Sequence, residues 1–158
     1  LFRSQMIVRD DSIEVLKSEN LKAVTIKTVP YPGFATDLQQ PITPLLLMAN
    51  GESMIQDTIY PKRVKHIAEL RRMGGDVDSE KPGHIRVNYS PRLIGTDVEA
   101  AEIRAGAALV IAAIMAEGET VINDADHILR GYDRIQDKLT ALGADVSIEG
   151  IDLINLMP

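Results

Sequence analysis

Four charged side chains are of types that bind anionic ligands and exchange protons with them. Asp37 follows the proline- and glycine-containing segment 31–36 and precedes a leucine-rich run. A carboxylate in such a place can accept a proton as a general base. An acid there is also common at the positively charged start of a helix, so the residue alone leaves both interpretations open.

The other three candidates are the arginines Arg63, Arg104 and Arg130. A guanidinium group stays charged and pairs with a planar anion through two parallel hydrogen bonds, so these residues suit a ligand with several negative charges. They could also stabilise charge that develops in a reaction intermediate. A single arginine at the start of a helix is more often a solvated residue paired with a nearby acid, and this alternative also stays open.

The chain as a whole argues against several other functions. It has 158 residues, no cysteine and a net charge of −6. The lack of cysteine excludes a disulfide framework, a cysteine-ligated zinc site and a cysteine nucleophile, and the three histidines lack metal-ligand spacing, so we expect no metal site. The negative charge argues against nucleic-acid binding. No apolar run could span a bilayer and no signal peptide is visible, so we predict a cytoplasmic protein with no membrane partner.

Two parts of the chain, residues 51–78 and 118–147, follow the same pattern. Each runs Gly-Glu-(Ser/Thr)-apolar-Ile-polar-Asp, reaches Arg63 or Arg130, and closes on Gly-(Gly/Ala)-Asp-Val. Each follows an alanine- or leucine-rich run, 37–49 or 102–116. A repeat of this length indicates a duplicated supersecondary unit.

The elements that would position these residues alternate between strands and helices. Alternating apolar residues predict short strands and a hairpin within residues 5–30. Further strands are expected at 52–57, 84–89 and 120–125, and helices over 37–49, 61–73, 102–116 and from Arg130 to Gly143. This order predicts an α/β architecture in one domain.

Three local details can be checked against a structure. Thr36 is expected to cap the first helix. The third helix should carry one apolar face made of Ile103, Ala107, Val110, Ile111 and Ile114. The last helix should bury Ile135, Leu139 and Leu142, and a turn is expected around Asp124, Asp126 and His127.

Several strings go beyond periodicity. They are YPGFATDLQ at 31–39, IRAGA at 103–107, AEG at 116–118, HILRGYDRI at 127–135 and KLTALGA at 138–144. Together they resemble the UDP-N-acetylglucosamine 1-carboxyvinyltransferase family of enolpyruvyl transferases, from about residue 1 to about residue 148. The sister family, which makes 5-enolpyruvylshikimate-3-phosphate, shares the fold but not the Arg-Gly-Tyr string at 130–132.

The resemblance implies an inside-out α/β barrel domain built from repeated βαβαββ units. Residues 1–158 would form a single domain of this kind, with repeat units at about 31–90 and 91–149 and with remnant strands of a further unit in 1–30. The family has two such domains with the site between them. Because the chain also begins with Leu1, we expect it to be a C-terminal fragment that holds half a site and is inactive alone.

The implied reaction moves the enolpyruvyl group of phosphoenolpyruvate to the 3-hydroxyl of UDP-N-acetylglucosamine and releases phosphate. This is the first committed step of peptidoglycan synthesis, so the resemblance also implies roles in cell wall biogenesis, cell shape and cell division. It implies no cofactor. The expected partners are the two substrates and the missing other domain of the same chain.

The resemblance also assigns residue roles. Asp37 would contact the sugar hydroxyl as the base, Arg104 and Arg130 would hold phosphoenolpyruvate, and Arg63 would be a third site arginine. The backbone of Ile59 would contact the sugar nucleotide.

Glu102 stands where the family has Asp, so its acid reaches one methylene further. It is counted with Asp37 and Arg104 as catalytic. That departure supports one alternative, a non-catalytic binding or regulatory paralogue of the same fold, and the other alternative is 5-enolpyruvylshikimate-3-phosphate synthase.

Overall fold

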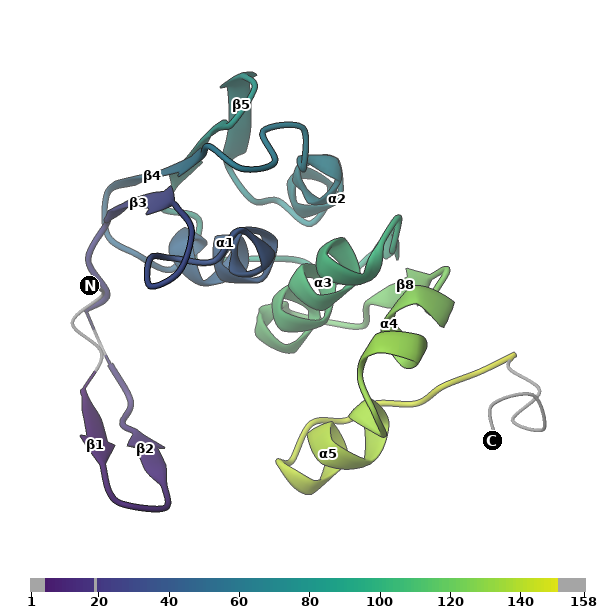
Figure 1. Ribbon diagram of the computed structural model, residues 1–158. Coiled ribbons are helices and arrows are strands. Elements are labelled where there is room, and N and C mark those ends of the chain that lie inside the picture. Colours follow the sequence, from purple (N-terminus) through teal and green to yellow (C-terminus); the bar gives the residue numbers. More distant parts are fainter. Residues whose placement is uncertain (1–4, 19, 151–158) are drawn as a thin grey trace.

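The computed structural model describes residues 5–18 and 20–150. Strands and helices alternate through most of this part of the chain, and Figure 1 shows a sheet covered by α1 and α2, with α3, α4 and α5 following on one side. The expected α/β architecture is confirmed, in the form of a mixed α+β fold.

The chain begins with a separate antiparallel hairpin, β1 (Met6–Val8) and β2 (Ile13–Val15). The hairpin expected within residues 5–30 is therefore present. All six strand residues are exposed, and the hairpin extends away from the rest of the chain (Figure 1).

The central sheet has the order β3-β4-β6-β5. Its strands are β3 (Thr25–Thr28), β4 (Glu52–Asp57), β5 (Val77–Lys81) and β6 (His84–Asn88). β3 and β4 are parallel, and the other two neighbouring pairs are antiparallel. The sheet includes β3, which lies before residue 31, where the repeat unit was expected to begin; the division of the chain into domains stays a prediction.

Helices make the connections that a parallel pair needs. α1 (Gln39–Leu47) joins β3 to β4, and α2 (Lys65–Arg72) joins β4 to β5. From β3 to β6 the element order is therefore βαβαββ, which is the unit that the resemblance implied.

A second series repeats most of this order. β7 (Asp97–Glu99) and β8 (Val121–Asn123) are parallel, and α3 (Ile103–Met115) joins them. α4 (Asp126–Gly131) and α5 (Ile135–Ala141) follow. Within the described residues, no hairpin closes this second series.

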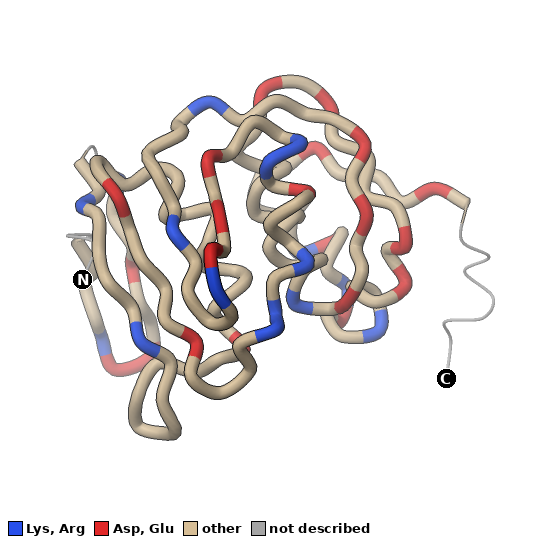
Figure 2. Tube along the Cα trace, turned by 90° about the horizontal axis from the view of Figure 1, so that it is seen from above, with Lys and Arg blue, Asp and Glu red and all other residues tan. Residues whose placement is uncertain are grey.

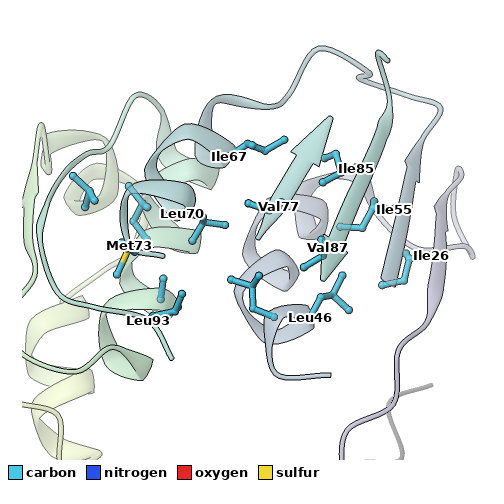
Figure 3. Packing of buried hydrophobic residues seen from close by; sticks show 14 residues of the cluster. Ile26, Leu46, Ile55, Ile67, Leu70, Met73, Val77, Ile85, Val87 and Leu93 are labelled. Carbon is cyan, nitrogen blue, oxygen red and sulfur yellow. The ribbon is translucent and has the colours of Figure 1, made fainter. Parts of the chain in front are cut away.

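The core lies between the central sheet and the helices. In β4 the inward positions alternate, so that Ser53, Ile55 and Asp57 are buried. Figure 3 shows side chains of the sheet meeting Leu46 of α1 and Leu70 of α2. α3 packs against α1 and α2, which brings the starts of three helices into one region.

Three local expectations were wrong. Thr36 does not cap a helix, since Ala35 occupies the cap position of the short 3-10 helix Thr36–Leu38 without a side-chain hydrogen bond. The turn expected around Asp124 and His127 continues as α4 from Asp126 onward. The last helix, α5, buries none of its residues: Ile135 and Leu139 are only half-buried, and Leu142 is 84% exposed, because among the described residues nothing packs over the end of α5.

The apolar face of α3 exists, but most of it is not in the core. The fully buried side consists mainly of small residues, Ala105, Gly106, Ala107, Ala108, Leu109 and Ala112. Ile103, Val110, Ile111 and Ile114 instead line an open cavity of about 510 Å³. Small residues let α3 lie close to its neighbours, and the larger ones face the side that the described residues leave open.

Candidate active site

Asp37 lies between two arginines that come from different helices. Its Oδ1 atom accepts hydrogen bonds from Arg63 Nη1 at 2.8 Å and from Arg104 Nε at 2.7 Å. Asp37 precedes α1, Arg63 precedes α2, and Arg104 lies in the first turn of α3. The packing of α3 against α1 and α2 therefore places the three side chains together.

The two arginines change the electrostatics of Asp37. The hydrogen bond from Arg104 is the largest influence and lowers the pKa of Asp37 below its usual value, against a smaller opposing effect of burial, and Arg63 lowers it further. The same contact raises the pKa of Arg104. The Asp37 side chain is 61% exposed, so this ionised carboxylate is accessible to a ligand.

Asp57 organises the loop beside this cluster. The residue is 4% exposed, and its carboxylate accepts hydrogen bonds from the hydroxyls of Thr28 and Thr36, each at 2.8 Å. It also accepts bonds from the backbone N–H groups of Ile59 and Tyr60, each at 2.9 Å. Burial acts to raise the pKa of Asp57, but these hydrogen bonds outweigh it and the pKa is lowered.

Sequence reasoning missed Asp57 as an organising residue. The available signal was an acid at an inward position of a strand, where a charge needs several donors. Ile59, expected to contact a sugar nucleotide through its backbone, is half-buried, and its N–H is already bonded to Asp57. The residue after Ile59 is Tyr60, and the Arg63 guanidinium lies over its ring, 3.8 Å from the ring centroid.

Glu102 lies close to Arg104 but does not join Asp37. It occupies the cap position of α3 without capping the helix through its side chain. Its Oε1 accepts a hydrogen bond from Gln40 Nε2 at 2.5 Å, and its Oε2 lies 3.7 Å from Arg104 Nη1. Sequence reasoning did not single out Gln40.

Arg130 differs from Arg63 and Arg104 in its hydrogen-bond partners. It is exposed on α4, where its Nε donates to the backbone oxygen of Asp126 at 3.3 Å. Its Nη2 lies 3.4 Å from His127 Nδ1, and in the described part of the chain no carboxylate pairs with it. Its guanidinium is therefore available to an anion.

Two glycines keep α4, and with it Arg130, close to α3. A Cβ atom on Gly131 would collide with the side chain of Ile103, and one on Gly106 would collide with Ile128. The backbone that carries Arg130 thus lies against the first turn of α3, which also carries Arg104.

The cavity of about 510 Å³ adjoins the cluster. Asp37 and Arg104 form its charged part, and its apolar part comes from α1, α3 and α5 together with Leu38 and Tyr132. Acidic and basic residues are interspersed along the trace (Figure 2). The region could bind a molecule that carries both anionic groups and a less polar body.

The histidines take no part in this cluster. His66 is fully buried, its Nε2 lies 3.1 Å from Thr43 Oγ1, and burial lowers its pKa to about 3.

Among residues 5–18 and 20–150, no group of three or more His, Asp or Glu side chains could hold a metal ion. Nor does any helix in those ranges have the length and apolar character needed to cross a membrane.

The fold is that of the enolpyruvyl transferases. The structure resembles the enolpyruvyl transferase NikO from Streptomyces tendae with a TM-score of 0.83 and 26% identity, over 91% of this chain and 33% of that one. EPSP synthase from Acinetobacter baumannii aligns with a TM-score of 0.64 and 16% identity over 94% of this chain and 35% of that one, which supports the fold alone.

The family follows from the sequence match. A family model described as EPSP synthase (3-phosphoshikimate 1-carboxyvinyltransferase) matches residues 4–139, so the chain belongs to this family. Within it, the chain is 56% identical over 144 residues to UDP-N-acetylglucosamine 1-carboxyvinyltransferase 2 of Latilactobacillus sakei subsp. sakei (strain 23K). The UDP-N-acetylglucosamine 1-carboxyvinyltransferase of Streptococcus pneumoniae (strain Hungary19A-6) is also 56% identical over 144 residues.

These comparisons confirm the resemblance to UDP-N-acetylglucosamine 1-carboxyvinyltransferases that the sequence strings indicated. Each of the two matches covers 91% of this chain but 34% of the relative, so the chain spans about a third of the length of the curated relatives it matches.

Proposed function

We propose that this chain forms part of an enzyme that transfers the enolpyruvyl group of phosphoenolpyruvate to the 3-hydroxyl of UDP-N-acetylglucosamine. The observation that carries the proposal is the Asp37 carboxylate held between Arg63 and Arg104 at the edge of an open cavity. Because the chain spans about a third of its relatives, the rest of the site would come from the remaining two thirds.

In the proposed reaction Asp37 accepts the proton of the sugar hydroxyl. The hydroxyl oxygen adds to C2 of phosphoenolpyruvate while C3 receives a proton from an acid that the remaining two thirds of the protein would supply, which gives a tetrahedral intermediate. C3 then returns a proton to that acid, the double bond re-forms, the bond from C2 to the phosphate oxygen breaks, and phosphate leaves with the proton that Asp37 accepted. Arg104 and Arg130 would hold the phosphate and carboxylate of phosphoenolpyruvate, with Arg63 as a third cation. The backbone at Ile59 would contact the sugar nucleotide, and Glu102 would act beside Arg104.

The ligand-free contacts suggest how the base becomes active. A carboxylate that accepts two charge-assisted hydrogen bonds is a weak base, because those bonds favour its ionised form. An incoming phosphoenolpyruvate would compete with Asp37 for Arg63 and Arg104. As the arginines turn to the substrate, the pKa of Asp37 would rise toward its usual value just when a proton must be accepted.

The proposed reaction would also give the protein a role in peptidoglycan synthesis. Transfer to UDP-N-acetylglucosamine would make it the first committed enzyme of peptidoglycan synthesis in the cytoplasm, with consequences for cell wall biogenesis, cell shape and division. The proposed partners are the two substrates and the missing domain. The residue roles proposed here use no metal or cofactor.

The test uses a chimera in which this chain replaces the matching 144-residue segment of the Streptococcus pneumoniae relative. We expect the chimera to release phosphate from phosphoenolpyruvate with UDP-N-acetylglucosamine and not with shikimate 3-phosphate, while the 158-residue chain alone releases none. Activity with shikimate 3-phosphate instead would overturn the choice of acceptor. A folded chimera that binds both substrates without releasing phosphate, beside an active parent enzyme, would favour the non-catalytic alternative.

A further inference from the structure

Gln40 carries a buried amide that makes one side-chain hydrogen bond among the described residues. It is fully buried in α1, and its Nε2 reaches across to the carboxylate of Glu102 at the start of α3, a separation of 62 residues in sequence. Its Oε1 atom has no hydrogen-bond partner within the described residues. A buried amide is costly unless its bonds are made, so the single contact with Glu102 is the feature that accounts for it.

The start of α3 does not hold the Glu102 side chain in place. Its side chain does not cap α3, and its backbone is extended, with φ −165° and ψ 167°. Its Oε2 lies 3.7 Å from Arg104 Nη1, whereas Asp37 Oδ1 lies 2.7 Å from Arg104 Nε. Two carboxylates thus lie beside one guanidinium, and the shorter contact belongs to Asp37.

Glu102 is near enough to compete with Asp37 for Arg104. Its Oε2 is 3.7 Å from Arg104 Nη1, so a small rotation of the side chain would bring the two into hydrogen-bond distance. The bond from Gln40 draws its other oxygen toward α1 and so opposes that movement.

We propose that Gln40 is a positioning residue that anchors Glu102 and thereby keeps Arg104 paired with Asp37. The inference deepens the proposed function, on which it rests for its catalytic meaning. It concerns the ligand-free arrangement of the site, which can be measured without any reaction.

The first test is NMR of the 158-residue chain. In Gln40→Leu, a change of similar size that removes the donor, we expect the Arg104 Nε–H resonance to move toward its position in Asp37→Asn, where the bond to Asp37 is weakened. The matched control is Gln39→Leu, because Gln39 is the neighbouring glutamine, is equally buried and has no bonded partner for its side-chain oxygen or nitrogen among the described residues. We expect that control to leave the resonance in place.

A double variant shows whether the effect passes through Glu102. In Gln40→Leu/Glu102→Gln the competing charge is absent, so the Arg104 resonance should return to its wild-type position. Failure to return, or no movement in Gln40→Leu itself, would overturn the proposal. Gln40→Asn, whose amide is one methylene too short, provides the same test if Gln40→Leu does not fold.

The chimera separates this proposal from the proposed function. If the wild-type chimera is active, Gln40→Leu should lower kcat/KM by about 10- to 100-fold, the size expected for a misplaced site group, while Gln39→Leu should lower it much less. An inactive wild-type chimera would count against the proposed function and leave the NMR result to decide on Gln40. An active chimera that is indifferent to Gln40→Leu would contradict the positioning role.

Discussion

The Thr36 hydroxyl donates a hydrogen bond to Asp57 Oδ2 at 2.8 Å, so a buried carboxylate fixes the residue that precedes Asp37. The same carboxylate holds the backbone of Ile59 and Tyr60. The proposed base and the loop that leads to Arg63 therefore depend on one acid that would itself touch no substrate.

Asp57→Asn should destabilise the fold and loosen this loop. Oδ1 accepts the bonds from Thr28, Ile59 and Tyr60, and Oδ2 accepts the bond from Thr36. An amide oxygen in place of Oδ1 would keep three of these bonds but without the charge that strengthens them, and the amide nitrogen in place of Oδ2 could not accept the fourth. We expect a decrease of about 2–4 kcal/mol in the free energy of unfolding, measured by urea denaturation. The exposed Asp10→Asn is the control and should change stability by less than about 0.5 kcal/mol. Equal effects of the two variants would contradict the organising role of Asp57.

Tyr60 should help Arg63 to bind phosphoenolpyruvate by holding its guanidinium in position. The cation–π contact at 3.8 Å restricts the Arg63 guanidinium, and contacts of this kind contribute about 0.5–1 kcal/mol at exposed sites. Tyr60→Ala in the chimera should therefore raise the KM for phosphoenolpyruvate by about 2- to 5-fold. Tyr60→Phe keeps the ring and should change this KM little. An equally large rise in KM in Tyr60→Phe would assign the effect to the hydroxyl group instead of the ring.

His66 should make the chain less stable in mild acid. Its pKa is about 3 in the folded state because burial disfavours the charged ring, whereas the pKa of an unfolded histidine is about 6.5. Below about pH 6.5 the His66 ring binds a proton in the unfolded state but stays neutral in the folded state. The free energy of unfolding is therefore highest above about pH 6.5 and falls by about 1.4 kcal/mol per pH unit as the pH drops toward 3. Asp57, whose folded pKa is lowered, loses its contribution in the same direction but at lower pH.

Urea denaturation at pH 7, 6 and 5 measures this dependence. His66→Gln keeps a polar side chain beside Thr43 and should flatten the curve between pH 5 and 6.5, whatever its effect at pH 7. An unchanged slope in that variant would show that another group is responsible.

Much of the fold could be predicted from the sequence because its helices and most of its strands carry clear apolar periods. The exceptions have physical reasons. β5 contains one apolar residue, Val77, and holds its place through pairing with β6, while β7 has three residues and a single inward Val98. The exposure of Leu142 depends on what lies over α5, which periodicity cannot state.

The site could be predicted only in part. The resemblance pointed to Asp37, Arg63 and Arg104, but their contacts join residues 26 and 67 positions apart and depend on how three helices pack. Gln40 and Asp57 have no sequence signal of comparable strength, because each matters through a hydrogen bond to a distant residue. The structure brings some of these residues together, but the roles of all of them stay predictions: Asp37, Ile59, Arg63, Glu102, Arg104 and Arg130.

The most direct measurement is phosphate release by the chimera with Asp37→Ala. If Asp37 accepts the proton of the sugar hydroxyl, the variant should lose about 100- to 10,000-fold in kcat with UDP-N-acetylglucosamine, while Asp10→Ala keeps wild-type activity. A chimera that works equally well without the Asp37 carboxylate would contradict the account.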